Sequence, residues 1–171
     1  MRIIKVWDKK DYDPAWRRFI RSTARAVIIR EGKLALVRSA SEGFYLFPGG
    51  GIRRGESRIN ALIRETGEET GLTIIRSSIR ELGMFREIRR SIYHNEIFDQ
   101  RSYYYTANVK CRVEEQHLEP YEKKLGFELC FVDPQEAYEH EMALAKKLNR
   151  NLLFREAAVL REIIDSGLCL A

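Results

Sequence analysis

The stretch R-E-T-G-E-E-T-G-L, residues 64–72, carries three glutamates at spacings that a helix gathers on one face. Glu65, Glu68 and Glu69 stand three and four residues apart, so in a helix their like charges repel by roughly a few tenths of a kcal/mol per pair. Gly67, in the middle of the turn, costs about another 1 kcal/mol relative to alanine. The turn is unfavourable in isolation, which indicates that a positive charge stabilises it.

Local signals on both sides of this stretch predict where its helix begins and ends. Ser57 is typical of an N-cap and Gly71 of a helix C-terminus, so the predicted helix covers about 57–70. Upstream lies the run Gly49-Gly50-Gly51, whose backbone can approach a ligand closely because glycine has no side chain. Carboxylates beside a glycine loop suit a hard divalent cation, and Mg²⁺ takes oxygen ligands. Such a metal would supply the positive charge.

Short apolar, β-prone runs separated by turn signals predict strands before and after this helix. These runs cover residues 2–7, 23–30, 33–39, 73–85, 101–111 and 127–133. The second and third runs read as a hairpin around Glu31-Gly32. Asp133 and Pro134 then open a C-terminal helix, and a second helix ends near Gly167. The order predicts an α/β domain in which helices cover a mixed sheet.

The spacing of the glycine loop and the glutamate helix resembles the Nudix box, G-x5-E-x7-R-E-U-x-E-E-x-G-U. Gly50 is followed after five residues by Glu56, and after seven more by the run that begins at Arg64 and ends at Leu72. Only Thr66 departs from the pattern, at a position that is usually apolar. The hairpin and the run L-F-P-G-G extend the likeness to the Nudix hydrolase family from about residue 22 to residue 72.

The resemblance implies a fold and a domain organisation. The fold would be a Nudix-type α/β/α sandwich with a mixed β-sheet, in which the box forms a loop-helix-loop. One domain would fill residues 1–171, with a core of about 22–140, an N-terminal extension over 1–21 and C-terminal helices over about 134–167.

The resemblance also implies a reaction, which is the hydrolysis of a nucleoside diphosphate linked to another group by attack of water on phosphorus. The cofactor would be Mg²⁺, with Mn²⁺ as the alternative, and its ligands would be the three box glutamates and a backbone carbonyl: Glu65, Glu68, Glu69 and Gly49. Glu128 would be a weaker candidate for a further ligand. Glu56 and Arg64 would form a pair in which the arginine orients these carboxylates. A metal ion and positioned charges suit this chemistry, because a diphosphate is a resistant, negatively charged electrophile.

The residue that takes the proton of the attacking water stays open at this point. Glu68 and Glu69 are the first candidates. Some family members use a glutamate from a later loop, for which Glu128 is the best match, ahead of Glu119 and Glu122. Any of these three also fits an ordinary surface position.

Four arginines are candidates for binding substrate phosphate. Arg38 ends the second strand of the predicted hairpin, where nucleotide-cleaving relatives have a basic residue. Arg25, Arg53 and Arg54 are weaker candidates, because a solvated arginine is common. Residues 85–105 mix aromatic, arginine and amide side chains that could stack on and hydrogen-bond a base, although alternating tyrosines equally fit a half-buried strand.

Several substrate classes remain open. No proline lies between Pro48 and Pro120, so the proline that commonly follows the box in ADP-ribose-cleaving relatives is missing. Nucleoside triphosphates, oxidised nucleotides and dinucleoside polyphosphates fit equally well. The alternatives from other classes are a 5′-end RNA pyrophosphohydrolase or decapping enzyme, and a non-catalytic nucleotide-binding regulatory module. The second alternative is disfavoured because every glutamate of the box is present.

The charge distribution and the cysteines indicate which partners and which cellular location to expect. Residues 1–60 carry 14 Lys and Arg against 6 Asp and Glu, whereas residues 61–171 carry 16 against 19. A basic N-terminal part suits an anionic small molecule such as a nucleotide, and we expect neither a nucleic-acid nor a membrane partner; a homodimer stays open. Cys111, Cys130 and Cys169 lie far apart without CxxC spacing, which predicts reduced thiols and a cytoplasmic location.

Overall fold

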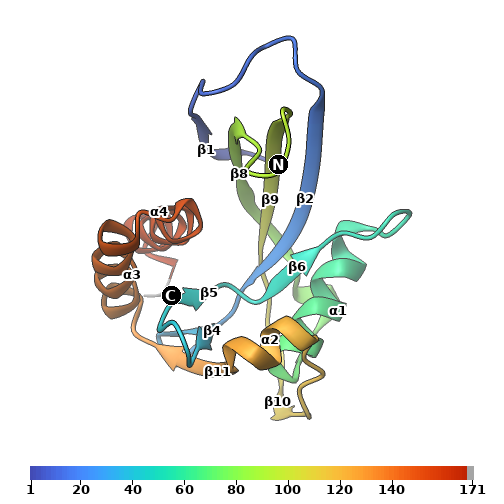
Figure 1. The fold of residues 1–171 in the computed structure, drawn as a ribbon. Coiled ribbons are helices and arrows are strands. Elements are labelled where there is room, and N and C mark those ends of the chain that lie inside the picture. Colours follow the sequence, from blue (N-terminus) through green and yellow to red (C-terminus); the bar gives the residue numbers. More distant parts are fainter. Residues whose placement is uncertain (169–171) are drawn as a thin grey trace.

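The structure is a computed structural model that describes residues 1–168, and it confirms an α/β fold with a mixed sheet (Figure 1). Its largest sheet has the strand order β1-β8-β9-β2-β6. These strands cover Ile3–Asp8, Arg80–Arg90, Ile97–Thr106, Arg18–Val27 and Gly49–Gly51. The pairs β1·β8 and β9·β2 are parallel, whereas β8·β9 and β2·β6 are antiparallel.

Two smaller antiparallel sheets complete the strand layer. One has the order β11-β4-β3, with β5 paired to β4, and the other joins β10 to β7. Their strands cover Phe127–Val132, Lys33–Ser39, Ile29–Arg30, Tyr45–Leu46, Val109–Val113 and Leu72–Ile74. The predicted hairpin is confirmed, because Ile29 pairs with Leu34 across the turn at Glu31 and Gly32.

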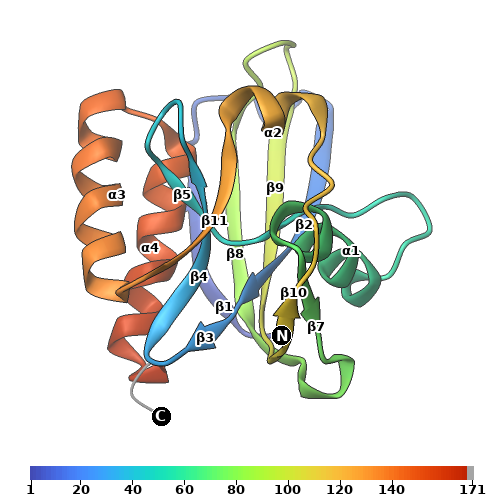
Figure 2. The ribbon, with the colours of Figure 1, turned by 90° about the horizontal axis from the view of Figure 1, so that it is seen from below.

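Helices cover both sides of the strands, as Figure 2 shows with α1 on one side and α3 and α4 on the other. The four helices cover Arg58–Thr70, Pro120–Leu125, Pro134–Leu148 and Asn151–Asp165, in the order α1 to α4. Ala61 and Leu62 of α1 pack against Ala24 and Ala26 of β2 in one core cluster. Val159 and Leu160 of α4 belong to a second core cluster on the opposite face. The expected α/β/α layering therefore holds.

The predicted helix ends are confirmed. The Ser57 side chain accepts a 3.1 Å hydrogen bond from the Asn60 amide, and Gly71 closes α1 in the left-handed conformation with φ 69°. The Asp133 carboxylate caps α3, with Pro134 in its first turn. The short helix α2 was not predicted from the sequence, because only six residues form it.

The N-terminal residues build part of the largest sheet. β1 pairs with β8 at its edge, and the first residues of β2 extend the sheet beyond the core, above the rest of the molecule in Figure 1. Cys111 is exposed on β10, and Cys130 is half-buried on β11. Cys169 lies outside the described residues. Within residues 1–168, no helix has the length and apolar character needed to cross a membrane.

Candidate active site

The three consecutive glycines form β6, and two of them leave room for a neighbour. Gly49 has φ 132°, and a Cβ there would lie 2.1 Å from the Ala24 carbonyl oxygen. A Cβ on Gly50 would lie 2.3 Å from Glu65 Oε2. The absence of side chains therefore lets β6 lie against β2 on one side and lets the Glu65 carboxylate reach the backbone on the other.

Arg64 connects the glycine loop to three glutamates. Its Nε and Nη2 each donate a 2.9 Å hydrogen bond to the two carboxylate oxygens of Glu56. Its Nη1 donates to Glu65 Oε1 at 2.7 Å and to Glu68 Oε2 at 3.1 Å, and Nη2 also reaches the Gly51 carbonyl at 3.2 Å. One guanidinium thus fixes the loop and two metal-ligand candidates in one arrangement, because its planar fork presents several donors at once.

Glu69 is the most buried carboxylate of the box, with 3% of its surface exposed. Its Oε2 accepts a 2.8 Å hydrogen bond from the Gly49 amide. Burial raises the pKa of Glu69 to about 8, against the lowering effects of Arg25 and of that amide. Burial also raises the pKa of Glu65, whereas the hydrogen bonds from Arg64 lower the pKa of Glu56 to about 2. A cation in this place would favour the ionised forms of Glu65 and Glu69.

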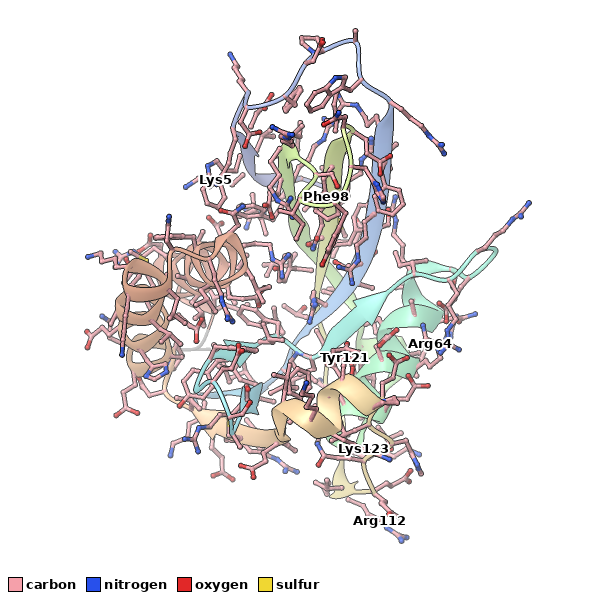
Figure 3. All side chains as sticks on the ribbon, viewed as in Figure 1. Lys5, Arg64, Phe98, Arg112, Tyr121 and Lys123 are labelled. Atoms are coloured by element: carbon pink, nitrogen blue, oxygen red, sulfur yellow. The ribbon has the colours of Figure 1, made fainter. Side chains whose placement is uncertain are left out.

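A cavity of about 490 Å³ opens beside these residues. The charged side chains that line it come from four segments of the chain: Arg21, Arg25, Arg53, Glu65, Glu69 and Glu119. Tyr121 of α2 also lines it, and Figure 3 shows Tyr121 and Arg64 on the neighbouring elements α2 and α1. Carboxylates and guanidiniums face the same cavity, which suits an anion held beside a metal ion.

Arg25 has a backbone partner and a free donor. Only 7% of its surface is exposed, and its Nη1 donates a 2.7 Å hydrogen bond to the Phe47 carbonyl. Its Nε is buried and has no hydrogen-bond partner within the described residues. Arg25 is paired with Gly49 across β2 and β6, so its guanidinium stands next to the glycine loop.

A buried ion pair in α4 supports the segment that leads into the glycines. Arg155 Nη2 donates to Glu156 Oε1 at 2.7 Å, and the Phe47 amide donates to Glu156 Oε2 at 3.1 Å. No local sequence signal predicted this pair. The pair fixes the backbone of Phe47, whose carbonyl in turn holds Arg25.

Two site residues were missed or ranked low from the sequence. Arg21 belongs to no motif, although the alternation of a strand places residues 21, 23 and 25 on one face. Glu119 was ranked behind Glu128, yet Glu119 lines the cavity.

Three predicted residues lie away from this cavity. Glu128 and Arg38 are opposite each other on β11 and β4, and both are exposed. Phe127 lines the cavity, so its neighbour Glu128 projects to the other face of the strand. Arg54 is exposed in the turn before α1. The structure therefore does not bring Glu128, Arg38 or Arg54 to the site.

The donors of the box fit a hard cation by their chemistry. Glu65 Oε2 lies next to Gly50, and Glu69 faces the same cavity, so the candidate metal ligands here are oxygen atoms. Glu68 differs, because it is held on Arg64 and does not line the cavity. Across residues 1–168, no three His, Cys, Asp or Glu side chains form a ready-made metal site.

A comparison with protein-family models decides the family. The model described as NUDIX domain matches residues 20–153. The chain belongs to the NUDIX family. The Nudix resemblance inferred from residues 50–72 is thereby confirmed, and the matched range includes every residue assigned above to the cavity.

A solved NUDIX hydrolase shares the fold. A NUDIX hydrolase from Nitrosomonas europaea is 20% identical, with 87% of this chain and 90% of that chain covered and a TM-score of 0.61. A MutT structure described for Aliivibrio salmonicida and Vibrio cholerae is 16% identical over 69% of this chain and 83% of that chain, with a TM-score of 0.48. A search of the curated proteins found no match.

Proposed function

We propose that this NUDIX protein is a Mg²⁺-dependent pyrophosphohydrolase that cleaves a nucleoside diphosphate-linked substrate by attack of water on phosphorus. NUDIX hydrolases generally act on nucleoside diphosphate derivatives, which supports the reaction class. The observation that carries the proposal is the cavity in which Glu65 and Glu69 face Arg21 and Arg25. This charge distribution suits a diphosphate that is held by a metal ion on one side and by arginines on the other.

Glu65 and Glu69 would hold the metal, with Glu68 and the Gly49 carbonyl as further ligands. When bound, Mg²⁺ supplies positive charge to the phosphate oxygens and lowers the pKa of bound water; Mn²⁺ is the alternative ion. Arg64 would keep Glu65 and Glu68 oriented, since it already binds both.

Arg25 and Arg53 line the same cavity, and their guanidiniums would bind phosphate oxygens. A guanidinium suits this role, because it stays charged and presents several donors to a phosphate. Positioning and charge stabilisation are the main contributions a protein makes to phosphoryl chemistry.

A carboxylate in the cavity would take the proton of the attacking water. Glu69 enters from α1, and Glu119 enters from the segment before α2. Glu68 fits less well, because Arg64 holds it outside the cavity lining. We therefore place Glu69 and Glu119 first among the candidates for the general base.

The test is release of phosphate or pyrophosphate from a panel of nucleotides with Mg²⁺. The panel holds nucleoside triphosphates, 8-oxo-dGTP, ADP-ribose, NADH, dinucleoside polyphosphates and UDP-sugars. We expect turnover of at least one member, and we expect Glu69→Gln and EDTA each to lower it by about 100-fold or more. Glu115→Gln, an exposed glutamate outside the cavity, is the control and should keep wild-type turnover.

If no member of the panel is hydrolysed although the protein binds Mg²⁺, the proposal of a small-nucleotide substrate is refuted. Capped RNA and RNA with a 5′ triphosphate are the substrates to test next. A protein that binds nucleotides and hydrolyses neither class would be a regulatory module.

A further inference from the structure

A second cavity adjoins the catalytic one along β2. Its volume is about 520 Å³, and the side chains that line it include Phe19, Arg21, Phe98 and Tyr93. Arg21 lines both cavities, so the two spaces meet at this side chain. In Figure 3, Phe98 lies on the long strands of the sheet, above Tyr121 at the catalytic cavity.

Two phenylalanines form an aromatic surface in this second cavity. Phe19 of β2 is paired with Phe98 of β9, and their ring centroids are 6.1 Å apart at an interplanar angle of 31°. Phe19 is 48% exposed, which is unusual for a large apolar side chain on the central sheet of a domain. The Arg89 guanidinium covers the Phe98 ring at 4.3 Å and is itself held by Glu87 at 2.8 Å. The uncovered part of the surface is therefore Phe19.

Arg21 provides a charge next to this surface. Strand alternation places Phe19, Arg21 and Arg25 on the same face of β2, in a row that leads toward the glycine loop. Among the described residues, the Arg21 side chain makes no hydrogen bond and no salt bridge. Arg25 and Arg155 nearby repel its charge, and Glu65 attracts it. An unpaired guanidinium beside other cations favours an anionic ligand.

We propose that the second cavity is the nucleobase subsite of the substrate, in which the base stacks on Phe19 beside Phe98 and Arg21 binds a phosphate between the base and the site of hydrolysis. This inference rests on the proposed function, because it assigns a place to another part of the same substrate. Aromatic stacking accepts any base, since every base has a π-face.

The spacing along β2 also indicates the substrate class. Phe19 and Arg25 are six residues apart, which is about 20 Å along an extended strand. A base on Phe19 therefore lies far from Glu65 and Glu69, which favours a substrate with a long polyphosphate chain, such as a dinucleoside polyphosphate, over a substrate with a single diphosphate.

Calorimetric titration of the full chain with Mg²⁺ tests this subsite without requiring turnover. The probes are β,γ-imido ATP and β,γ-imido GTP, and imidodiphosphate is the probe without a base. We expect Phe19→Ala to weaken both nucleotide analogues by about tenfold or more and to leave imidodiphosphate within about twofold. Phe19→Tyr keeps the aromatic surface and should bind the analogues as the wild type does.

Ile20→Ala is the matched control. Ile20 is also 48% exposed and follows Phe19, but it projects to the opposite face of β2. This variant should leave all three affinities unchanged, and thermal unfolding checks that both alanine variants are folded.

Three results would overturn the subsite. They are equal affinity of the wild type for imidodiphosphate and the nucleotide analogues, an equal effect of Phe19→Ala on all three probes, and no binding of either nucleotide analogue. If Phe19→Ala changes the sedimentation of the protein but not nucleotide affinity, the surface is a subunit interface instead. If nucleotide binding depends on Phe19 but no nucleotide is hydrolysed, the subsite is retained and the proposed function is refuted. If a nucleotide is hydrolysed and Phe19→Ala leaves its KM unchanged, the proposed function is retained and the subsite is refuted.

Discussion

Arg64 holds Glu56 through two parallel hydrogen bonds of 2.9 Å, from Nε to Oε1 and from Nη2 to Oε2. The pair spans eight residues and ties the turn after the glycines to the helix that carries the metal-ligand candidates. A bidentate pair of this kind fixes a direction as well as a distance. Arg64 is therefore oriented before it contacts Glu65 and Glu68.

We expect Glu56→Gln to lower the free energy of unfolding by about 1 kcal/mol at pH 7, a value reduced for the partial exposure of this pair. The pKa of Glu56 in the folded chain is about 2, below its ordinary value, so its stabilisation is present at neutral pH and is lost as the pH falls from about 4.5 toward 2. Urea unfolding at several pH values measures both. A difference between the two proteins that does not shrink in acid would contradict the role of the Glu56 charge.

Replacing each of the three glycines of β6 by alanine should affect stability and activity differently. Gly49→Ala should destabilise the fold by about 3 kcal/mol. Its φ of 132° is strained for alanine, and the added Cβ would lie 2.1 Å from the Ala24 carbonyl oxygen, which belongs to the backbone of β2. Gly50→Ala should keep most of the stability and lose about tenfold or more of kcat, because the new Cβ displaces the end of the Glu65 side chain and no backbone atom.

Gly51→Ala is the control for both, since a Cβ there meets nothing within 4 Å. Its free energy of unfolding should stay within about 0.5 kcal/mol of the wild type. Thermal unfolding together with kcat for the best nucleotide of the panel separates the three variants. Equal loss of activity and stability in Gly50→Ala would show that the loop, and not Glu65, is what the substitution disturbs.

Glu119 and Glu128 provide a test of which late glutamate acts at the site. Glu119→Gln should lower kcat by about tenfold or more, because Glu119 lines the cavity, and Glu128→Gln should leave it within about twofold. Steady-state kinetics at saturating Mg²⁺ decides between them. A loss in Glu128→Gln alone would mean that β11 or the helix before it shifts when substrate binds.

Glu141 of α3 predicts a pH dependence of stability that is independent of the site. It is fully buried, its Oε1 accepts a 2.6 Å hydrogen bond from the Tyr45 amide, and its Oε2 has no partner within the described residues. Burial raises the pKa of Glu141 to about 8. Since the folded chain retains this proton longer than the unfolded chain, the free energy of unfolding should fall as the pH rises from about 4.5 to 8.

Glu141→Gln removes this titration. The variant should therefore gain stability relative to the wild type as the pH rises, by roughly 2–4 kcal/mol at pH 9. Glu139→Gln, exposed on the same helix, is the control and should follow the wild type. Chemical unfolding between pH 5 and 9 measures the difference, and parallel curves for the wild type and Glu141→Gln would refute the prediction.

The sequence by itself determined the parts of the site that depend on neighbouring residues. The caps Ser57 and Gly71 and the spacing of Glu56 and Arg64 predicted the box helix, since caps and helix faces are set within a few positions of the chain. The same local rules predicted the hairpin around Glu31 and Gly32 and the start of α3.

Tertiary structure alone decided which distant residues share the cavity. Arg21 and Glu119 line it, whereas Glu128 and Arg38 were better candidates on sequence and lie elsewhere. A shift of one residue moves a strand side chain to the opposite face, and no local signal fixes where a loop or strand meets a helix distant in sequence. The residues of the box can therefore be identified from the sequence, but packing and strand register determine which other residues line the cavity.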